Sequence, residues 1–265
     1  IFITMTVTAA QIKELREITG IGMMECKKAL EEANGDMDQA IELLRKKGLA
    51  KAAKKADRET FEGWIKILTE WNKAYIVSVS CETDFLANSD KFKAMLEKVA
   101  EFLKEHWADS KAEAQEFINK NYALEMWENL QVSNYQIIEW DVLAPYVHSN
   151  SKLAALVVAK AGTDFEKAKQ VAMHVTASNP EYLSPDDISD DIIEKEKSIQ
   201  LEIMRNDSKM WNKTDDVLLK IIEGKMWKFK AEISLLEQDF VMDPSQKVKN
   251  FIGEGNITAF YRYSI

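Results

Sequence analysis

The chain has 265 residues, 46% of them hydrophobic and 30% charged, with two cysteines and a net charge of −9. A chain of this length usually makes two or three domains and buries a sizeable core. No stretch approaches the roughly 20 apolar residues that span a membrane, and the acidic balance argues against nucleic-acid binding. The separated Cys26 and Cys81 fit buried thiols better than a disulfide. These features predict a soluble, cytoplasmic protein.

A three-helix bundle is predicted for residues 5–48. Met5 is the expected natural first residue, because residues 1–4 are too short and too uncharged for a signal peptide. The first helix follows a capping-box pattern that begins at Thr8, the second follows a Gly-Ile-Gly break, and the third is expected to end at Gly48. This arrangement resembles the ubiquitin-associated type of domain.

The start of the second helix is a candidate docking surface. Two adjacent methionines, Met23 and Met24, follow Gly22, and neighbouring positions on a helix cannot both face a small core. A bundle of this size also leaves apolar surface uncovered. Gly22, Met23 and Met24 are therefore candidate partner-binding residues. The alternative, that the methionines fill the core, stays open.

Residues 49–60 are predicted to form a basic linker. Between Arg45 and Glu59 the chain holds seven basic residues against two acids. Such a run can bind RNA phosphates, but no aromatic side chains are interleaved with it to stack on bases. A solvated, partly helical linker is the favoured interpretation.

Two related α+β core subdomains are predicted after the linker. The first covers residues 61–134, and the second covers residues 135–180 and 230–265. The first is expected to contain a hairpin and two helices: strands 61–68 and 74–80, helix 91–105 and helix 110–129. The second is expected to contain four strands and a helix: strands 135–142, 155–159, 232–241 and 258–263, and helix 166–177.

A Thr-Asp-Phe corner follows an apolar strand in each subdomain. It occurs at residues 83–85 and again, 80 residues later, at residues 163–165. Each copy lies between a predicted strand and a predicted helix. This order fits two related subdomains, although chance remains an alternative for so short a match.

The aromatic residue of the first corner has two interpretations. In one, Phe85 fills the local core while Thr83 or Asp84 caps the coming helix. In the other, Phe85 stands out of the corner as a wedge for a partner's pocket. The frequency with which aromatic residues are buried favours the first interpretation.

Residues 181–229 are predicted to be an antiparallel coiled-coil hairpin inserted in the second subdomain. Two amphipathic helices flank a polar loop, and strand-like sequence resumes after them. Trp211 and Trp227 are expected outside the seam between the helices, which suggests a surface for a partner or for self-association. Alternatively, the two tryptophans cover the loop and the base of the hairpin.

No reaction centre is visible in the sequence. His106, His148 and His174 lack metal-ligand spacing, and there is no phosphate-binding glycine loop or nucleophile signature. The sequence therefore predicts a binding protein with no catalytic residue, metal, cofactor or direct nucleotide binding. An adaptor for ubiquitin-like or peptide ligands and an unrecognised hydrolase are the rival interpretations.

Several motifs together resemble the translation elongation factor Ts family. They lie at residues 19–30, 33–36, 81–85, 172–175, 178–180 and 223–226, within a match that runs from about Thr6 to the last residue. The resemblance implies a guanine nucleotide exchange factor that binds the elongation factor Tu GTPase, promotes GDP release and allows GTP reloading.

The resemblance also implies roles for particular residues. Thr83, Asp84, Phe85 and Leu86 would intrude into the GTPase and disturb its Mg²⁺ and phosphate site, which reverses the preferred interpretation of Phe85. The N-terminal bundle would contact the nucleotide domain. His148 is a weaker candidate for a partner contact than Phe85, because Ser151, Lys152 and Ala154 stand where the family usually has glycines and an arginine.

Overall fold

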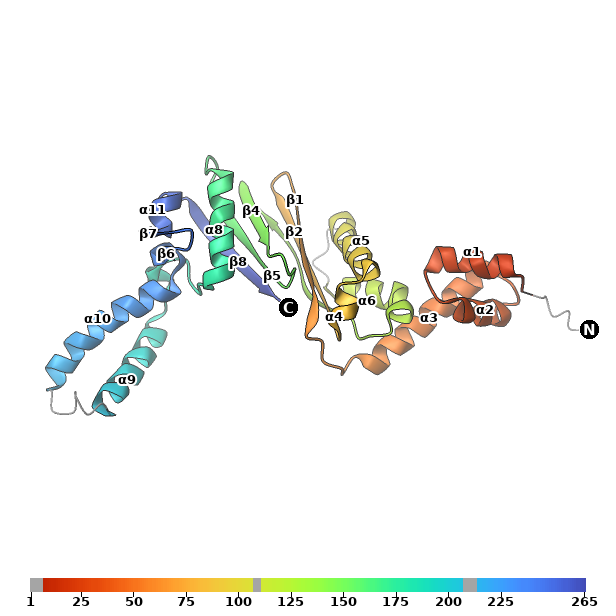
Figure 1. The fold of residues 1–265 in the computed structure, drawn as a ribbon, viewed down its shortest axis with the longest axis horizontal. Coiled ribbons are helices and arrows are strands. Elements are labelled where there is room, and N and C mark those ends of the chain that lie inside the picture. The colour runs from red at the N-terminus through yellow and green to blue at the C-terminus, as the bar shows by residue number, and fades with distance from the viewer. Residues whose placement is uncertain (1–6, 107–110, 207–213) are drawn as a thin grey trace, which may run out of the picture. The chain divides into compact units, whose positions relative to one another are not determined.

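The computed structural model describes residues 7–106, 111–206 and 214–265 (Figure 1). Two compact units emerge. The first contains the residues up to Glu139 with Ser149–Leu153 and Tyr263–Ile265, and the second contains Trp140–His148 and Ala154–Arg262. The predictions for Met5 and Trp211 lie outside the described residues. Within the described part of the chain, no helix is both long and apolar enough to cross a membrane.

The first unit begins with the three-helix bundle that the sequence predicted. Its helices are α1 (Ala9–Thr19), α2 (Met23–Glu32) and α3 (Met37–Lys55). Thr8 and Gln11 form the predicted capping box, and Gly20 ends α1 in the left-handed conformation at φ +70°. The buried core of the bundle includes Leu15, Cys26, Leu30 and Leu44.

Helix α3 does not end at Gly48, as the sequence had suggested. It continues to Lys55, so residues 49–55 of the predicted linker are helical. A Cβ atom at Gly48 would lie 2.9 Å from the carbonyl oxygen of Asn119 in α6 (Lys111–Asn121). The glycine is therefore explained by close helix packing, and the sequence pattern was misread as a helix stop.

A three-stranded antiparallel sheet completes the first unit. Its strands are β1 (Glu62–Glu70), β2 (Lys73–Cys81) and β3 (Gln131–Glu139), with β2 in the centre. Helix α5 (Asp90–His106) buries Phe92, Met95, Val99 and Leu103 in the same core as β2. The strand that we placed in the second subdomain from residue 135 pairs with β2 instead.

In its described part, the segment that was predicted as one helix over residues 110–129 contains two helices, the second of only four residues. Within the described residues, α6 ends at Asn121 and α7 (Ala123–Met126) follows it. Leu124 of α7 belongs to the core of the bundle, whereas Met126 belongs to the core under the sheet. This short helix therefore joins two hydrophobic cores within the first unit.

The second unit contains a sheet with the order β4-β5-β8, formed by β4 (Val142–Val147), β5 (Leu153–Ala159) and β8 (Ile257–Ser264). Helix α8 (Phe165–Ser178) packs its buried residues against this sheet. The predicted strand over residues 232–241 is wrong for most of its length. That region holds the end of a helix, the 3-10 turn Leu235–Glu237 and the two-residue strand β6 (Asp239–Phe240).

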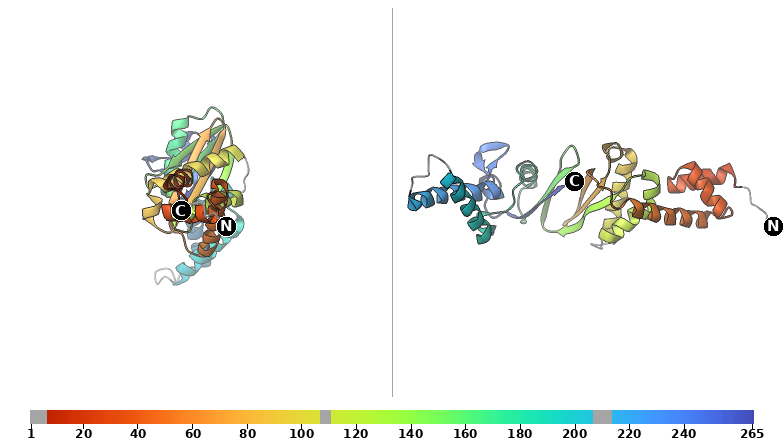
Figure 2. Two further views of the ribbon diagram at one scale, coloured as in Figure 1. Left: turned by 90° about the vertical axis from the view of Figure 1, so that its right-hand side faces the viewer. Right: turned by 90° about the horizontal axis from the view of Figure 1, so that it is seen from below.

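Two long helices occupy the region of the predicted hairpin. They are α9 (Asp190–Asn206) and α10 (Asp215–Ile233), which lie side by side (Figure 1, Figure 2). A 3-10 turn at Pro185–Asp187 precedes them, and β7 (Asp243–Lys247) and α11 (Val248–Ile252) follow. Apolar side chains form their seam, with Met204, Leu218, Ile222 and Met226 buried. The amphipathic pattern predicted both helices correctly.

Candidate functional site: an exposed aromatic corner

The first Thr-Asp-Phe corner is a tightly capped turn at the end of β2. Thr83 is extended, with φ −124° and ψ 152°, and its hydroxyl accepts a hydrogen bond from the Leu86 N–H at 3.3 Å. This is N-cap geometry, and it starts the four-residue helix α4 (Asp84–Ala87). The corner is therefore a defined structure before any partner arrives.

Phe85 points away from the core of the first unit. Its side chain is 87% exposed, whereas Leu86 packs against the core and Ala87 is buried. The interpretation in which Phe85 fills the local core is wrong. The turn uses its next two residues for packing, because one helical turn cannot direct three consecutive side chains to one side.

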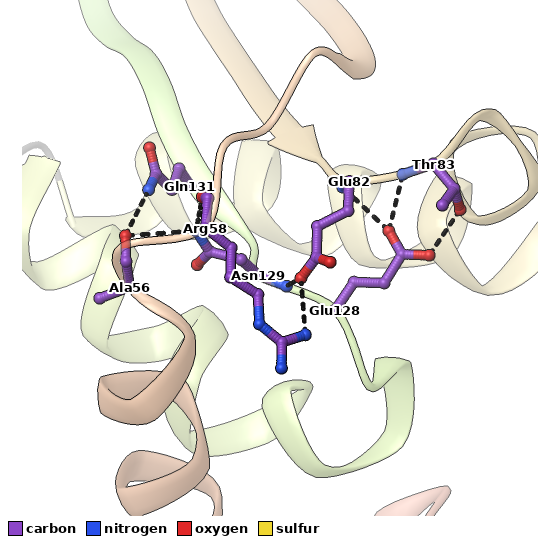
Figure 3. A network of polar contacts seen from close by, with 7 residues as sticks. All are labelled: Ala56, Arg58, Glu82, Thr83, Glu128, Asn129 and Gln131. Carbon is purple, nitrogen blue, oxygen red and sulfur yellow. Dashed lines mark hydrogen bonds and ion pairs between the residues drawn. The ribbon is translucent and has the colours of Figure 1, made fainter.

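Glu128 clamps the corner from a segment 45 residues away in the sequence (Figure 3). One carboxylate oxygen accepts the backbone N–H groups of Glu82 and Thr83, both at 2.9 Å. The other accepts the Thr83 hydroxyl at 2.5 Å. Hydrogen bonds to an ionised carboxylate are stronger than those between neutral groups, so these three fix the backbone on entry to α4.

The Glu82 carboxylate forms a reciprocal set of hydrogen bonds with the segment that carries Glu128. Glu82 accepts the backbone N–H of Asn129 at 2.6 Å and an Arg58 guanidinium N–H at 3.3 Å. The buried Asn129 side chain donates in turn to the Arg58 carbonyl at 2.7 Å and to the Ala56 carbonyl at 3.4 Å. The corner, the start of β3 and the end of α3 thus share one polar network (Figure 3).

Two titratable side chains near this network are buried. Burial, followed by the charge of Glu128, raises the pKa of the Cys81 thiol to about 12. The protonated thiol donates to the Thr83 carbonyl at 3.3 Å and supports the corner as a neutral group. Burial lowers the pKa of Lys55, with Arg58 and Lys51 adding to the shift and Glu82 and Glu128 opposing it. Both cysteines are free and buried, as predicted.

The bundle exposes its own apolar side chains. Met23 is 52% exposed and Met24 66% exposed, so the interpretation in which they fill the core is wrong. Gly22 occupies the N-cap position of α2. Ile18, which the sequence analysis did not single out, is also largely exposed.

Comparisons with known proteins identify the family. A family model described as Elongation factor TS matches residues 82–265. The Elongation factor Ts of Cronobacter sakazakii (strain ATCC BAA-894) is 43% identical over 264 residues, covering 98% of this chain and 91% of the relative. Those of Klebsiella pneumoniae (strain 342) and Salmonella enteritidis PT4 (strain P125109) are 42% identical with the same coverage.

The chain belongs to the elongation factor Ts family. The resemblance drawn from the sequence motifs is confirmed, and the chain is a translation elongation factor with a role in protein biosynthesis. Membership supports a nucleotide exchange role. Within the described residues, no three His, Cys, Asp or Glu side chains are grouped as a metal site would require.

His148, the weaker candidate suggested by the elongation factor Ts resemblance, lies in the second unit just after β4. Its Nδ1 atom is 3.0 Å from the Tyr146 hydroxyl, and the two rings meet edge to face at 6.1 Å. Ser151, one of the residues at which the resemblance implied a departure from the family, adopts the left-handed conformation at φ +56°. A serine therefore takes a backbone conformation that is more usual for glycine.

Glu128 and its neighbour Trp127 were not predicted from the sequence. Trp127 is exposed, has φ +58°, and lies under the Lys51 ammonium, whose Nζ is 4.3 Å from the ring centroid. No local pattern marks Glu128 among the 44 acidic residues of the chain. The pairing becomes visible only when β3 is placed beside β2.

Proposed function

We propose that this chain promotes GDP release from elongation factor Tu by inserting its Thr83–Leu86 corner next to the GTPase's Mg²⁺ and phosphate site. Family membership supports the exchange role. The observation that carries the mechanism is the 87% exposure of Phe85 on a turn that is capped and clamped. Exposed aromatic side chains on rigid elements are typical binding anchors.

The energy available from one aromatic side chain suits this task. Burying a phenylalanine in a partner's pocket yields about 1.5–3 kcal/mol. Since 1.4 kcal/mol corresponds to a tenfold change in an equilibrium constant, Phe85 alone supplies about a 10- to 100-fold preference for the GTPase state that has the pocket open. The prefolded turn keeps the ordering cost small.

Exchange then follows from thermodynamic coupling. The factor binds the empty GTPase more tightly than the GDP-loaded form, so GDP weakens the factor's binding by the same ratio. Displacing the ligands of Mg²⁺ and the phosphates loosens GDP, and GTP then reloads the site. The Mg²⁺ and the nucleotide belong to the partner, and this chain transfers no chemical group.

The bundle and His148 add binding energy in this proposal. Gly22, Met23 and Met24 would contact the nucleotide domain of the GTPase through the exposed start of α2, and His148 would make a further contact. Met23→Ala combined with Met24→Ala is expected to raise the concentration of factor that gives half-maximal exchange without lowering the melting temperature. If the concentration of factor at half-maximal exchange did not change, the exposed start of α2 would have to serve another partner.

The direct experiment uses elongation factor Tu loaded with fluorescent GDP. Mixing with the chain and excess unlabelled GTP is expected to accelerate the loss of fluorescence, with a rate that rises with factor concentration and saturates. Release at the spontaneous rate, from a chain shown to be folded, would contradict the proposal. Recovery of a complex without accelerated release would favour an adaptor role.

A second candidate role concerns the helical hairpin. Trp227 is 67% exposed on α10, and the exposed apolar residues Ile199, Ile203, Val217 and Leu219 lie on the same two helices. We propose that this surface serves a partner or a second copy of the chain. Replacing residues 190–225 by a short Gly/Ser linker is expected to keep exchange and to weaken complex formation or self-association, measured by analytical ultracentrifugation. Complete loss of exchange in this deletion variant, if it is folded, would show that the hairpin is essential for GDP release.

A further inference from the structure

We propose that Glu128 is a positioning residue that holds the Thr83–Leu86 corner in the conformation that presents Phe85. This inference rests on the proposed function of the corner. The residue acts through the backbone of the corner, and no contact between Glu128 and the partner is required.

The two backbone N–H groups that donate to Glu128 have no partner in the sheet. The registered pairs of β2 end at Cys81 with β1 and at Ser80 with β3, so the N–H groups of Glu82 and Thr83 lie beyond the ladder. Both are bound by one Glu128 oxygen at 2.9 Å. Without this carboxylate, the backbone between the strand and the helical turn would be held by the Thr83 cap, the Cys81 thiol and the bonds of the Glu82 side chain.

The position of Glu128 is itself fixed from several sides. Two residues before it, Met126 lies in the core under the sheet, and Leu124 lies in the core of the bundle. One residue after it, the Asn129 N–H is held by the Glu82 carboxylate at 2.6 Å. The two segments therefore exchange backbone-to-carboxylate hydrogen bonds in both directions, which restrains their relative movement more than one bond would.

Rigidity at the corner has a functional consequence because ordering a loop on binding weakens affinity. A corner that samples several conformations presents Phe85 correctly for a fraction of the time, and the apparent affinity falls by that fraction. Glu128→Ala is therefore expected to raise the half-saturating factor concentration about tenfold, with a smaller change in the maximal release rate. Phe85→Ala, which removes the anchor itself, is expected to lower the maximal rate.

The first experiment needs no GTPase. Amide hydrogen exchange of the free chain is expected to be about tenfold faster at Glu82 and Thr83 in Glu128→Ala, with the rest of β2 unchanged. Glu128→Gln retains an acceptor oxygen for the two N–H groups but loses the negative charge, so exchange at Glu82 and Thr83 should become about threefold faster. If the alanine variant fails to fold, an unchanged exchange rate in folded Glu128→Gln would contradict the inference. Glu70→Ala, which removes a carboxylate paired with Lys104 away from the corner, is the matched control.

The second experiment combines the variants in the GDP-release assay. Glu128→Ala is expected to add little in a Phe85→Ala background, since both act through one contact. If Glu128→Ala weakened GDP release in the Phe85→Ala background as much as it does alone, Glu128 would have to touch the partner. If amide exchange were unchanged in folded Glu128→Ala, the residue would not hold the corner. Either result overturns the inference. If Phe85→Ala releases GDP normally, the proposed function fails, while the amide measurements still decide the positioning role.

Discussion

The two Thr-Asp-Phe corners share their sequence and their place after a central strand, yet they present their phenylalanines differently. Phe85 follows β2 and is 87% exposed, whereas Phe165 follows β5 and is 47% exposed. The first corner leads into a helix of four residues, and the second leads directly into one of fourteen. The same three residues therefore take different structures, and their surroundings decide which.

The helix cap accounts for much of the difference. In the first corner the cap is Thr83, which places Phe85 second in the helix; in the second the cap is Asp164, which places Phe165 first. The Asp164 carboxylate accepts the Lys167 N–H at 2.9 Å. A shift of one residue turns the side chain by about 100° around the helix.

The carboxylate clamp is the other difference. Glu128 binds the hydroxyl of Thr83, whereas the buried hydroxyl of Thr163 has no hydrogen-bond partner among the described residues. A restrained corner with an exposed aromatic suits insertion into a partner. The second corner is explained as the start of a structural helix.

The largest expected effect separates the two phenylalanines. Phe85→Ala should slow GDP release from elongation factor Tu about 10- to 100-fold and leave the melting temperature unchanged, because the side chain is exposed in the free chain. Phe165→Ala should change release less than twofold. Fluorescent-GDP release at saturating factor measures both. Equal effects from the two substitutions would remove the functional distinction between the corners.

The aspartates of the two corners, Asp84 and Asp164, are expected to differ in function and in stability. Substituting Asp84 should affect exchange, and substituting Asp164 should affect stability. Asp164→Ala removes an N-cap and should destabilise the chain by about 1 kcal/mol, with exchange little changed. Asp84 is exposed and does not cap its helix, so Asp84→Ala should keep stability and slow exchange, less than additively with Phe85→Ala. Urea unfolding and GDP release, measured on the same preparations, test this pair. A loss of stability in Asp84→Ala would assign the residue a structural role.

The threonines provide a smaller contrast. Thr163→Val removes a buried hydroxyl that lacks a partner at nearly constant volume, and it should leave stability unchanged or raise it by up to about 1 kcal/mol. Thr83→Val loses the cap and one clamp bond, so amide exchange at Leu86 should accelerate. Destabilisation by Thr163→Val would reveal a partner for that hydroxyl, for example a bound water.

Local signals in the sequence predicted the elements that depend on local interactions. The capping box at Thr8, the amphipathic pattern of α9 and α10, and the strand-to-helix corners are all found in the structure. The hairpin turn between β1 and β2 is also where the sequence predicted it. In each case residues within a few positions of one another carry the interaction.

Features that depend on distant residues escaped prediction. Gly48 looked like a helix stop because its neighbour, the Asn119 carbonyl, is 71 residues away in the sequence. The exposure of Phe85 follows from the packing of Leu86 and Ala87, and the role of Glu128 follows from the pairing of β3 with β2. The family resemblance corrected the interpretation of Phe85 but gave no indication of its clamp.

Acid sensitivity is expected in the helix that follows the second corner. His174 of α8 is fully buried, its Nε2 lies 2.8 Å from the Gln238 side-chain oxygen, and its Nδ1 accepts the Val241 N–H at 3.1 Å. The ring is therefore the neutral form protonated at Nε2. Burial lowers the pKa of His174, and the hydrogen bond to Gln238 opposes the shift only in part.

The sign of the pH dependence follows from these contacts. An unfolded histidine has a pKa of about 6.5, so between that value and the lower folded pKa the unfolded chain binds more protons than the folded chain. The contribution of His174 to the free energy of unfolding should therefore be constant above about pH 6.5. It should fall as the pH drops below that value. Protonating Nδ1 would also remove the acceptor of the Val241 N–H. In melting experiments between pH 7 and pH 5, His174→Gln should be less stable than the unmodified chain at pH 7 but lose less stability on acidification. Parallel losses in the two proteins would show that other groups cause the acid sensitivity.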